Sequence, residues 1–282
     1  MNKRQKSFSS IMKAIMYVFV VFTFALLLWI IGSVVLQGIP KLTKEMFSLV
    51  FTTENLSMLP SIINTLTVIV ITLAISIPIG LFTAIYLVEY APRGSKFVKV
   101  VRMATETLQG IPSIVFGLFG YIFFVRVVGL GYSILAGTFT LTIMVLPLII
   151  RATEEALIAV DDKLRQASYG LGARKLRTVF NVVLPPAMNG IISGIILAIG
   201  RIFGETAALQ FTAGTFEQIA KPTQQGSTLA VFMYNLTAEG RHTKEAYASA
   251  FVLLLFVILI NWLASRLGSR IGGINEWKYY WN

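Results

Sequence analysis

The residues best suited to bind a charged solute lie inside a long apolar stretch near residue 200. The segment GRIFGET, residues 200–206, places Arg201 and Glu205 four positions apart. Residues at that spacing share a helix face, so both side chains are predicted to point toward protein or a water-filled path. A guanidinium is planar and always charged, and it matches phosphate or carboxylate oxygens with two parallel hydrogen bonds. The stretch therefore predicts an anion site made by Arg201, Glu205 and the hydroxyl of Thr206.

Two roles for this pair stay open at the level of the sequence. An internal ion pair that only locks the helix would account for the burial of both charges, although such pairs are weak evidence of stabilisation. Alternatively, Glu205 holds Arg201 between substrate visits, or selects a protonated oxyanion by accepting its hydrogen. Arginine chemistry does not separate tetrahedral oxyanions, so phosphate, sulfate, molybdate and phosphonate all remain candidates. Arg126, at the end of another apolar run, either attracts anions or anchors a helix end.

The composition sets the environment in which these charges must work. Of 282 residues, 56% are hydrophobic and only 13% are charged, whereas soluble domains carry about 25% charged residues. Several apolar runs exceed the roughly 18 residues that indicate a membrane-spanning helix. The net charge of +11 is explained by basic residues on the cytoplasmic side of a membrane. We therefore expect a multi-span protein surrounded by membrane lipid, with no nucleic-acid partner.

The apolar runs predict six membrane-spanning helices, joined by polar loops. Their approximate bounds are residues 15–36, 62–88, 107–128, 134–150, 186–208 and 246–265. If the chain starts in the cytoplasm and alternates, the cytoplasmic segments hold 17 Lys and Arg and the external segments hold six. This asymmetry predicts that both termini are cytoplasmic. The expected divisions are an N-terminal segment 1–14, a permease domain 15–268 and a tail 269–282. Residues 89–106 are expected to form a loop with a short helix at most.

A polar island at residues 161–185 separates the fourth and fifth predicted spans. Apolar residues recur at helical spacing on both sides of Gly170 and Gly172, which predicts two short amphipathic helices meeting at a corner. Pro185 and Pro186 then begin the fifth span, because proline is tolerated in a first helical turn. From the pattern alone, a solvated loop without a partner is an equal alternative.

The spacing within this island resembles the EAA loop of ABC importer permeases. That motif reads Glu-Ala-Ala, three residues, Gly, nine residues, Ile, one residue and Leu-Pro. The matching residues are Gln166, Ala167, Ser168, Gly172, Val182, Leu184 and Pro185. The resemblance implies that the loop forms a coupling helix held in a cleft of a separate ATP-hydrolysing subunit. Gln166 replaces the acidic residue and loses its charge, and Ser168 replaces the second Ala.

Three further segments are similar to the PstA family of permeases of phosphate-specific ABC transporters. They read GIPSIVFG at 110–117, GRIFGETA at 200–207 and FTAG at 211–214. The resemblance implies an all-α integral membrane protein with the six-helix type I ABC importer permease fold and a coupling helix between its fourth and fifth spans. It also implies the homologous permease PstC, two copies of the ATPase PstB and the external phosphate-binding protein PstS as partners. Arg201 and Glu205 would occupy the family's charged transmembrane positions on the phosphate path.

The chain itself lacks the usual sequence motif for ATP hydrolysis. It contains no G-x-x-x-x-G-K-[ST] phosphate-binding loop, so ATP and Mg are expected on the partner ATPase and no cofactor on this chain. With no Cys and a single His242, no metal site is expected. An intramembrane enzyme would need a catalytic pair, and Glu154-Glu155 and Asp161-Asp162 are expected to be solvated instead. An ATPase-independent channel would not need a coupling loop. The sequence thus predicts a non-enzymatic permease subunit in a prokaryotic cell membrane that imports inorganic phosphate by alternating access.

Overall fold

The computed structural model describes residues 3–92, 94–238, 240 and 242–271, and the regular secondary structure in them is helical throughout. The α-helices are α1 (Lys3–Gly38), α2 (Leu59–Ile85), α3 (Lys96–Gln109), α4 (Ser113–Gly120), α5 (Ile134–Ile158), α6 (Asp162–Gly170), α7 (Lys175–Thr178), α8 (Leu184–Phe203), α9 (Ala207–Thr212), α10 (Leu229–Ala238) and α11 (Thr243–Ile271). Three π-helical turns extend them, namely η3 (Tyr86–Tyr90), η4 (Tyr121–Val127) and η5 (Val179–Val183), and η1 (Ile39–Lys41) and η2 (Glu45–Phe47) are short 3₁₀ turns. The aromatic end of the predicted tail lies outside the described residues.

Five of the described helices are long and apolar enough to cross a membrane, and a sixth span results if one bent pair is counted as one. That pair consists of Lys96–Gln109 and Ser113–Val127, which meet at 103°. The predicted unbroken third span at 107–128 is therefore wrong. Pro112 has no backbone N–H and disfavours helical geometry in the residue before it, so the helix ends ahead of it and restarts at Ser113.

Two further boundaries differ from the sequence prediction. α5 runs to Ile158, two turns beyond the predicted end of the fourth span at residue 150. The fifth span is continuous from Lys175 to Phe203, whereas residues 186–208 were predicted. The second half of the polar island is thus the first part of the fifth span, and α7, η5 and α8 form one unbroken rod.

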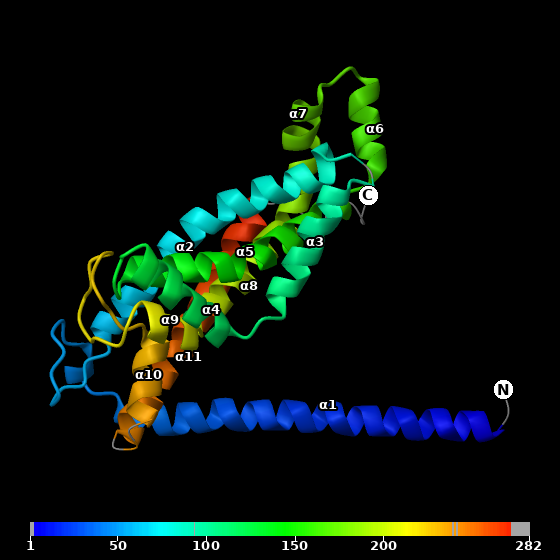
Figure 1. Ribbon diagram of the computed structural model, residues 1–282. Helices are drawn as coiled ribbons and strands as arrows, with labels where there is room; N and C mark the ends of the chain where they lie inside the picture. Colours follow the sequence, from blue (N-terminus) through cyan, green and yellow to red (C-terminus); the bar gives the residue numbers. More distant parts are fainter. Residues whose placement is uncertain (1–2, 93, 239, 241, 272–282) are drawn as a thin grey trace.

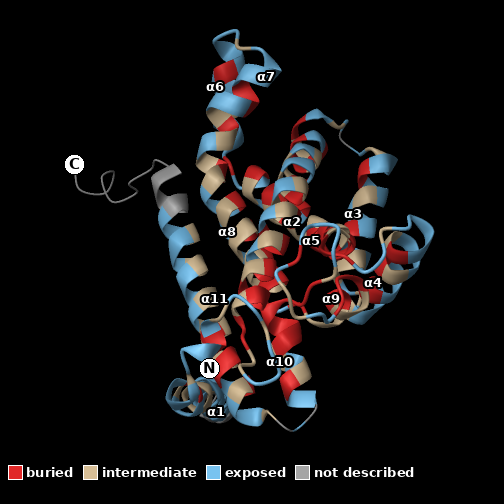
Figure 2. Ribbon diagram, turned by 90° about the vertical axis from the view of Figure 1, so that its left-hand side faces the viewer, coloured by how far each residue is buried: buried red, intermediate tan, exposed pale blue. Residues whose placement is uncertain are grey.

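The centre of the molecule is α5, which packs between α2 and α8 and is buried along most of its length (Figure 2). Small residues let the helix backbones approach each other, as is common between helices in membranes. A Cβ added to Gly80 of α2 would lie 2.7 Å from Ile149 Cγ2 of α5. On the other side of α5, Gly194 of α8 packs against Ala152. α2 and α5 therefore form a tightly apposed pair.

Helix α1 runs away from this body and meets it near α11 (Figure 1). Its Gly38 packs directly on α11, where an added Cβ would lie 2.6 Å from the carbonyl oxygen of Tyr247. Most of the α1 side chains are exposed and apolar. The helices α6 and α7 project from one end of the body (Figures 1 and 2). The segment 213–229, which ends at the first residue of α10, lies at the opposite end, against the beginnings of α2 and α5.

Candidate functional site

Of the two short helices predicted at residues 161–185, the first forms as α6 and meets α7 at the expected glycine corner, but the second is wrong, because α7 begins the continuous fifth span. Gly172 has φ +80°, in the left-handed region that favours glycine. No atom lies within 4 Å of the position of a Cβ there, so the requirement for glycine is conformational rather than steric. Asp161 begins α6, because its carboxylate accepts a hydrogen bond from the backbone N–H of Lys163 at 2.9 Å.

The exposed tip of the loop is apolar. Leu171 is 90% exposed, and Leu164 and Leu176 on either side of it are also exposed. Gln166 and Ala167 of the EAA-like motif are exposed as well. Further along the motif, Val182 and Leu184 are half-buried and Pro185 is exposed in the first turn of α8. The exposed apolar and polar groups at the tip are therefore available for contact with a partner.

The departure from the EAA pattern at Ser168 has a structural explanation. Its Oγ lies 2.8 Å from Oγ1 of Thr178, and both residues are buried. This hydroxyl pair ties α6 to α7 across the corner. An alanine at this position could not make the bond, so the serine fixes the angle between the two helices.

The base of the coupling loop is held by Arg165, which the sequence analysis did not single out. Its guanidinium donates to Glu89 of η3 from two nitrogens, at 3.0 and 2.8 Å, and to Asp162 at 3.1 Å. It also donates to the carbonyl oxygens of Leu157 and Val160, both at 2.7 Å. These carbonyls lie at the C-terminus of α5, where backbone acceptors have no helical partner. One side chain thus joins α6 to the ends of α2 and α5.

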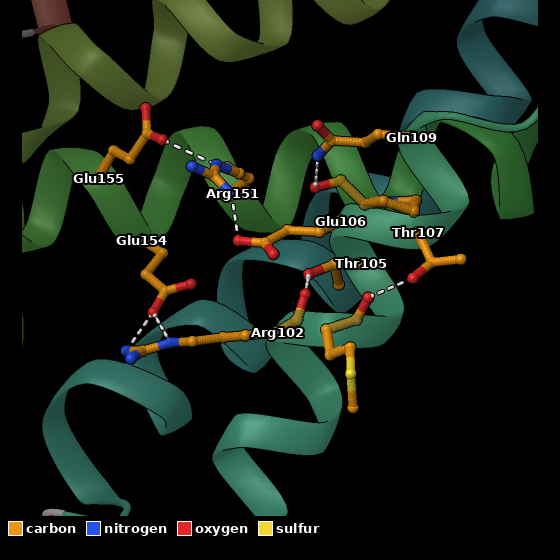
Figure 3. Close-up of polar contacts among 10 residues, drawn as sticks. Arg102, Thr105, Glu106, Thr107, Gln109, Arg151, Glu154 and Glu155 are labelled. Atoms are coloured by element: carbon orange, nitrogen blue, oxygen red, sulfur yellow. Dashed lines mark hydrogen bonds and ion pairs between the residues drawn. The ribbon is translucent and has the colours of Figure 1, made fainter.

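A second set of ion pairs joins α3 to α5 (Figure 3). Arg102 pairs with Glu154 through Nε at 2.6 Å, while Arg151 bonds to Glu106 at 2.8 Å and to Glu155 at 2.9 Å. Glu154 is buried, so the expectation that it is solvated is wrong. Only the second acid of the Glu154-Glu155 pair lies mainly in solvent.

The predicted shared helix face of Arg201 and Glu205 is also wrong. α8 ends at Phe203, and residues 204–206 leave the helix before α9 begins. Glu205 is buried, and its carboxylate accepts the backbone N–H of Ala208 at 3.0 Å. It therefore caps the start of α9, where a negative charge is favourable. Thr206 Oγ1 lies 3.4 Å from the carbonyl oxygen of Gly204, a weak contact within the same turn.

Arg201 is half-exposed on α8, and its guanidinium forms no hydrogen bond or ion pair with any other residue in the described part of the chain. At four-residue intervals before it, Asn189, Ser193 and Leu197 are exposed on the same face. The face is therefore polar except at Leu197, which is unusual for a membrane-spanning helix in contact with lipid. Arg126, by contrast, bonds to the Tyr121 hydroxyl at 2.8 Å and lies 5.3 Å from its ring centre, as a helix-end anchor does.

The fold brings together two of the segments that carried the family resemblance. Gly117 of α4 packs against α9, where an added Cβ would lie 2.9 Å from the Cα of Ala208. α4 and α9 are neighbours in Figure 1. Two half-helices, α4 and α9, thus begin after the breaks at residues 110–112 and 204–206 and pack on each other.

Comparison with protein families finds one model that matches residues 76–273, described as a binding-protein-dependent transport system inner membrane component. Among curated proteins, a probable ABC transporter permease of Bacillus subtilis, YqgI, is 34% identical over 271 residues, which cover 88% of this chain and 90% of the relative. The phosphate transport system permease protein PstA of Pasteurella multocida is 34% identical over 259 residues, covering 90% and 91%.

Solved structures show the same fold at low sequence identity. A bacterial alginate ABC transporter, solved with an alginate-bound periplasmic protein, contains a chain that matches with a TM-score of 0.70 at 14% identity, covering 96% of this chain and 98% of that one. The MetNI methionine ABC transporter, in an inward-facing conformation, matches with a TM-score of 0.59 at 21% identity, covering 75% and 93%. Both likenesses concern the fold alone.

Proposed function

The chain belongs to the family of binding-protein-dependent transport system inner membrane components, and on this premise we propose that it is the permease subunit of an ATP-driven importer of inorganic phosphate. It is a membrane protein with the type I ABC importer permease fold. The PstA relatives support phosphate as the substrate. The proposed partners are a homologous permease of the PstC type, two PstB-type ATPases that bind ATP and Mg, and an external PstS-type binding protein.

One observation carries the substrate proposal, and it is the state of Arg201. A charge at the centre of a lipid-facing helix costs about 2.5–3.5 kcal/mol, so Arg201 needs an acceptor. The described part of the chain supplies none, because the carboxylate of Glu205 caps α9 instead. A tetrahedral oxyanion matches the guanidinium with two parallel hydrogen bonds. The polar face of α8 that carries Asn189 and Ser193 then forms one wall of the path.

Glu205 and Thr206 have supporting roles in this proposal. The carboxylate of Glu205 fixes the turn at residues 204–206, next to the end of the helix that carries Arg201. Only one of its oxygens bonds to Ala208 in this arrangement, and the other can accept a hydrogen from a protonated phosphate. Thr206 adds a hydroxyl to the same turn. The proposal also puts both termini and the coupling loop on the cytoplasmic side, which the distribution of Lys and Arg supports.

The proposed transport cycle follows from the continuous helix that joins the coupling loop to Arg201. ATP-driven closure of the ATPase pair displaces the coupling loop, and α7, η5 and α8 carry that displacement along one continuous helix to Arg201. The path then opens alternately to the two sides of the membrane. The ATPase supplies the phosphoryl-transfer chemistry, and this chain binds, orients and releases the anion.

Phosphate uptake by the complete complex in lipid vesicles tests the assignment. We expect uptake of labelled phosphate that requires ATP and falls in the presence of excess unlabelled phosphate, but not of sulfate, molybdate or phosphonate. Uptake unaffected by unlabelled phosphate would contradict the substrate. Uptake that continues without ATP would instead identify a channel.

A further inference from the structure

We propose that α2 and α5 act together as a strut that links the coupling loop to the segment 213–229 at the opposite end of the molecule, with Arg165 and Asn64 as the positioning residues that hold its two ends. This proposal rests on the proposed function as a transporter, and it adds a second mechanical route beside the continuous helix through α8. The proposal follows from the buried polar contacts that hold each of these two helices at both of its ends.

At the end near the coupling loop, the strut is held from two sides. Arg165 of α6 joins Glu89, at the end of α2, to the last carbonyls of α5. The side chains of Arg165 and Glu89 are only 12% and 5% exposed. Lys175 of α7 adds a cation–π contact, with its Nζ 5.0 Å from the ring centre of Tyr90. Both helices of the coupling loop therefore grip the same end of α2.

The shaft of the strut is the close packing between the two helices, each of which contains an internal proline, Pro78 in α2 and Pro147 in α5. The absence of a side chain at Gly80 lets Ile149 approach the α2 backbone. Twenty-five residues separate Asn64 from Glu89, which corresponds to about 37 Å at a rise of 1.5 Å per residue. Because each helix lacks a backbone hydrogen bond at its proline, the packing between the two helices, and not the stiffness of either one, carries a displacement along the pair.

At the opposite end, Asn64 of α2 holds the segment 213–229 with all of its amide atoms. Its Nδ2 donates to the carbonyl oxygens of Gln218 and Ser227 at 2.8 and 2.9 Å. Its Oδ1 accepts the backbone N–H of Ala220 at 3.0 Å. Asn64 is fully buried. A primary amide carries both donors and an acceptor, so an apolar or acidic side chain could not make this set of bonds.

The beginning of α5 is bound to the same segment. The backbone N–H of Ile134 donates to the Gln224 carbonyl at 3.0 Å, and that of Leu135 donates to the Pro222 carbonyl at 2.8 Å. These are amides of a first helical turn, which have no partner within the helix. Each helix of the strut is thus fixed at both ends, and displacement of either end is passed to the other.

Reciprocity follows from this linkage. If ATP binding moves the segment 213–229, then a partner that binds this segment must change the affinity of the ATPase for ATP by the same coupling free energy. The segment lies on the side where an external binding protein would arrive. The strut therefore predicts that the response of the ATPase to a loaded binding protein depends on Asn64 and Arg165.

The test compares Arg165→Gln, Asn64→Ala and the double variant in the complete reconstituted complex, with Lys163→Gln as a control. Lys163 is exposed on the same helix as Arg165. We expect each of the two single variants to lose roughly tenfold of its stimulation by loaded binding protein, measured relative to the basal ATP hydrolysis of the same assembled variant. The double variant should lose no more stimulation than the more severely affected single variant, because both residues act on one strut. Losses that multiply in the double variant, or full stimulation in Arg165→Gln, would overturn the proposal.

A second readout separates the strut from simple misfolding. The chain has no cysteine, so Thr215→Cys gives one labelling site in the exposed part of the segment. In the otherwise unchanged complex, ATP trapping should change the fluorescence of a label at this site. Arg165→Gln should abolish the change, and Arg165→Lys should restore part of it. A label that responds equally in Arg165→Gln would contradict the strut. A wild-type label that responds in a complex that takes up no phosphate would leave the strut in place and contradict the proposed substrate.

Discussion

Arg165 and Arg201 lie near the two ends of the segment that joins the coupling loop to the proposed anion path, and their surroundings are opposite. Arg165 forms five hydrogen bonds to side chains and carbonyls of its own chain. Arg201 forms none with any other described residue. An arginine therefore joins elements of the protein at position 165, and at position 201 it is available to bind a ligand. In a membrane protein, the arginine without an internal acceptor is the better candidate for a substrate contact.

The largest effect that tests this comparison is on stability. Arg165→Gln leaves the buried carboxylate of Glu89 without its charged partner, and breaking such a pair costs about 3–5 kcal/mol. Arg201→Gln removes a charge that has no internal partner, so the free energy of unfolding should hardly change. Thermal unfolding of both variants in detergent measures the difference. Equal destabilisation by the two substitutions would remove the distinction between bracing and binding arginines.

The corner of the coupling loop gives a smaller effect with a matched control. Gly172→Ala forces a side chain into the left-handed region, at a cost of about 1–2 kcal/mol, whereas Gly170→Ala lies in α6, where alanine is favoured. Neither position has an atom within 4 Å of an added Cβ. We expect only Gly172→Ala to weaken assembly with the ATPase or to uncouple hydrolysis from uptake. Normal coupled complexes from Gly172→Ala would show that the corner tolerates other conformations.

The smallest effect concerns the hydroxyl pair between α6 and α7. Ser168→Ala removes the bond to Thr178, whose hydroxyl keeps only the 3.3 Å bond to the carbonyl oxygen of Arg174, and should destabilise the chain by about 1 kcal/mol. Replacing both residues, as Ser168→Ala with Thr178→Val, removes this weakly bonded buried hydroxyl and should recover part of the loss. Denaturant unfolding of the two variants gives the comparison. A double variant less stable than Ser168→Ala would contradict a direct bond between the hydroxyls.

Local sequence patterns predicted the coupling loop well and the proposed anion region poorly, for a physical reason. The corner at Gly172 and the helices beside it depend on nearby residues, so periodicity and glycine placement are sufficient to find them. The bond between Arg165 and Glu89 joins positions 76 residues apart, and no local spacing reveals it. The ion pair of Arg102 with the buried Glu154 escaped prediction for the same reason.

The errors at the two helix breaks have a different origin. Pro112 is visible in the sequence, but the length and hydropathy of the run favoured one unbroken span over the bend that the structure contains. Spacing alone likewise placed Glu205 on the face of Arg201. A helix of regular period continues in such a prediction until something ends it, and the cap that Glu205 provides to Ala208 forms only once the chain has turned.

The most direct test of the central claim is phosphate uptake by the complete complex with Arg201→Ala, with Arg126→Ala as the control. Loss of a charge-assisted contact worth about 3 kcal/mol should lower uptake roughly a hundredfold, while assembly and basal ATP hydrolysis remain. Arg126 already has Tyr121 as an internal contact, so its removal should leave uptake nearly unchanged. Unchanged uptake in Arg201→Ala would contradict the claim that this unpaired arginine binds the transported anion.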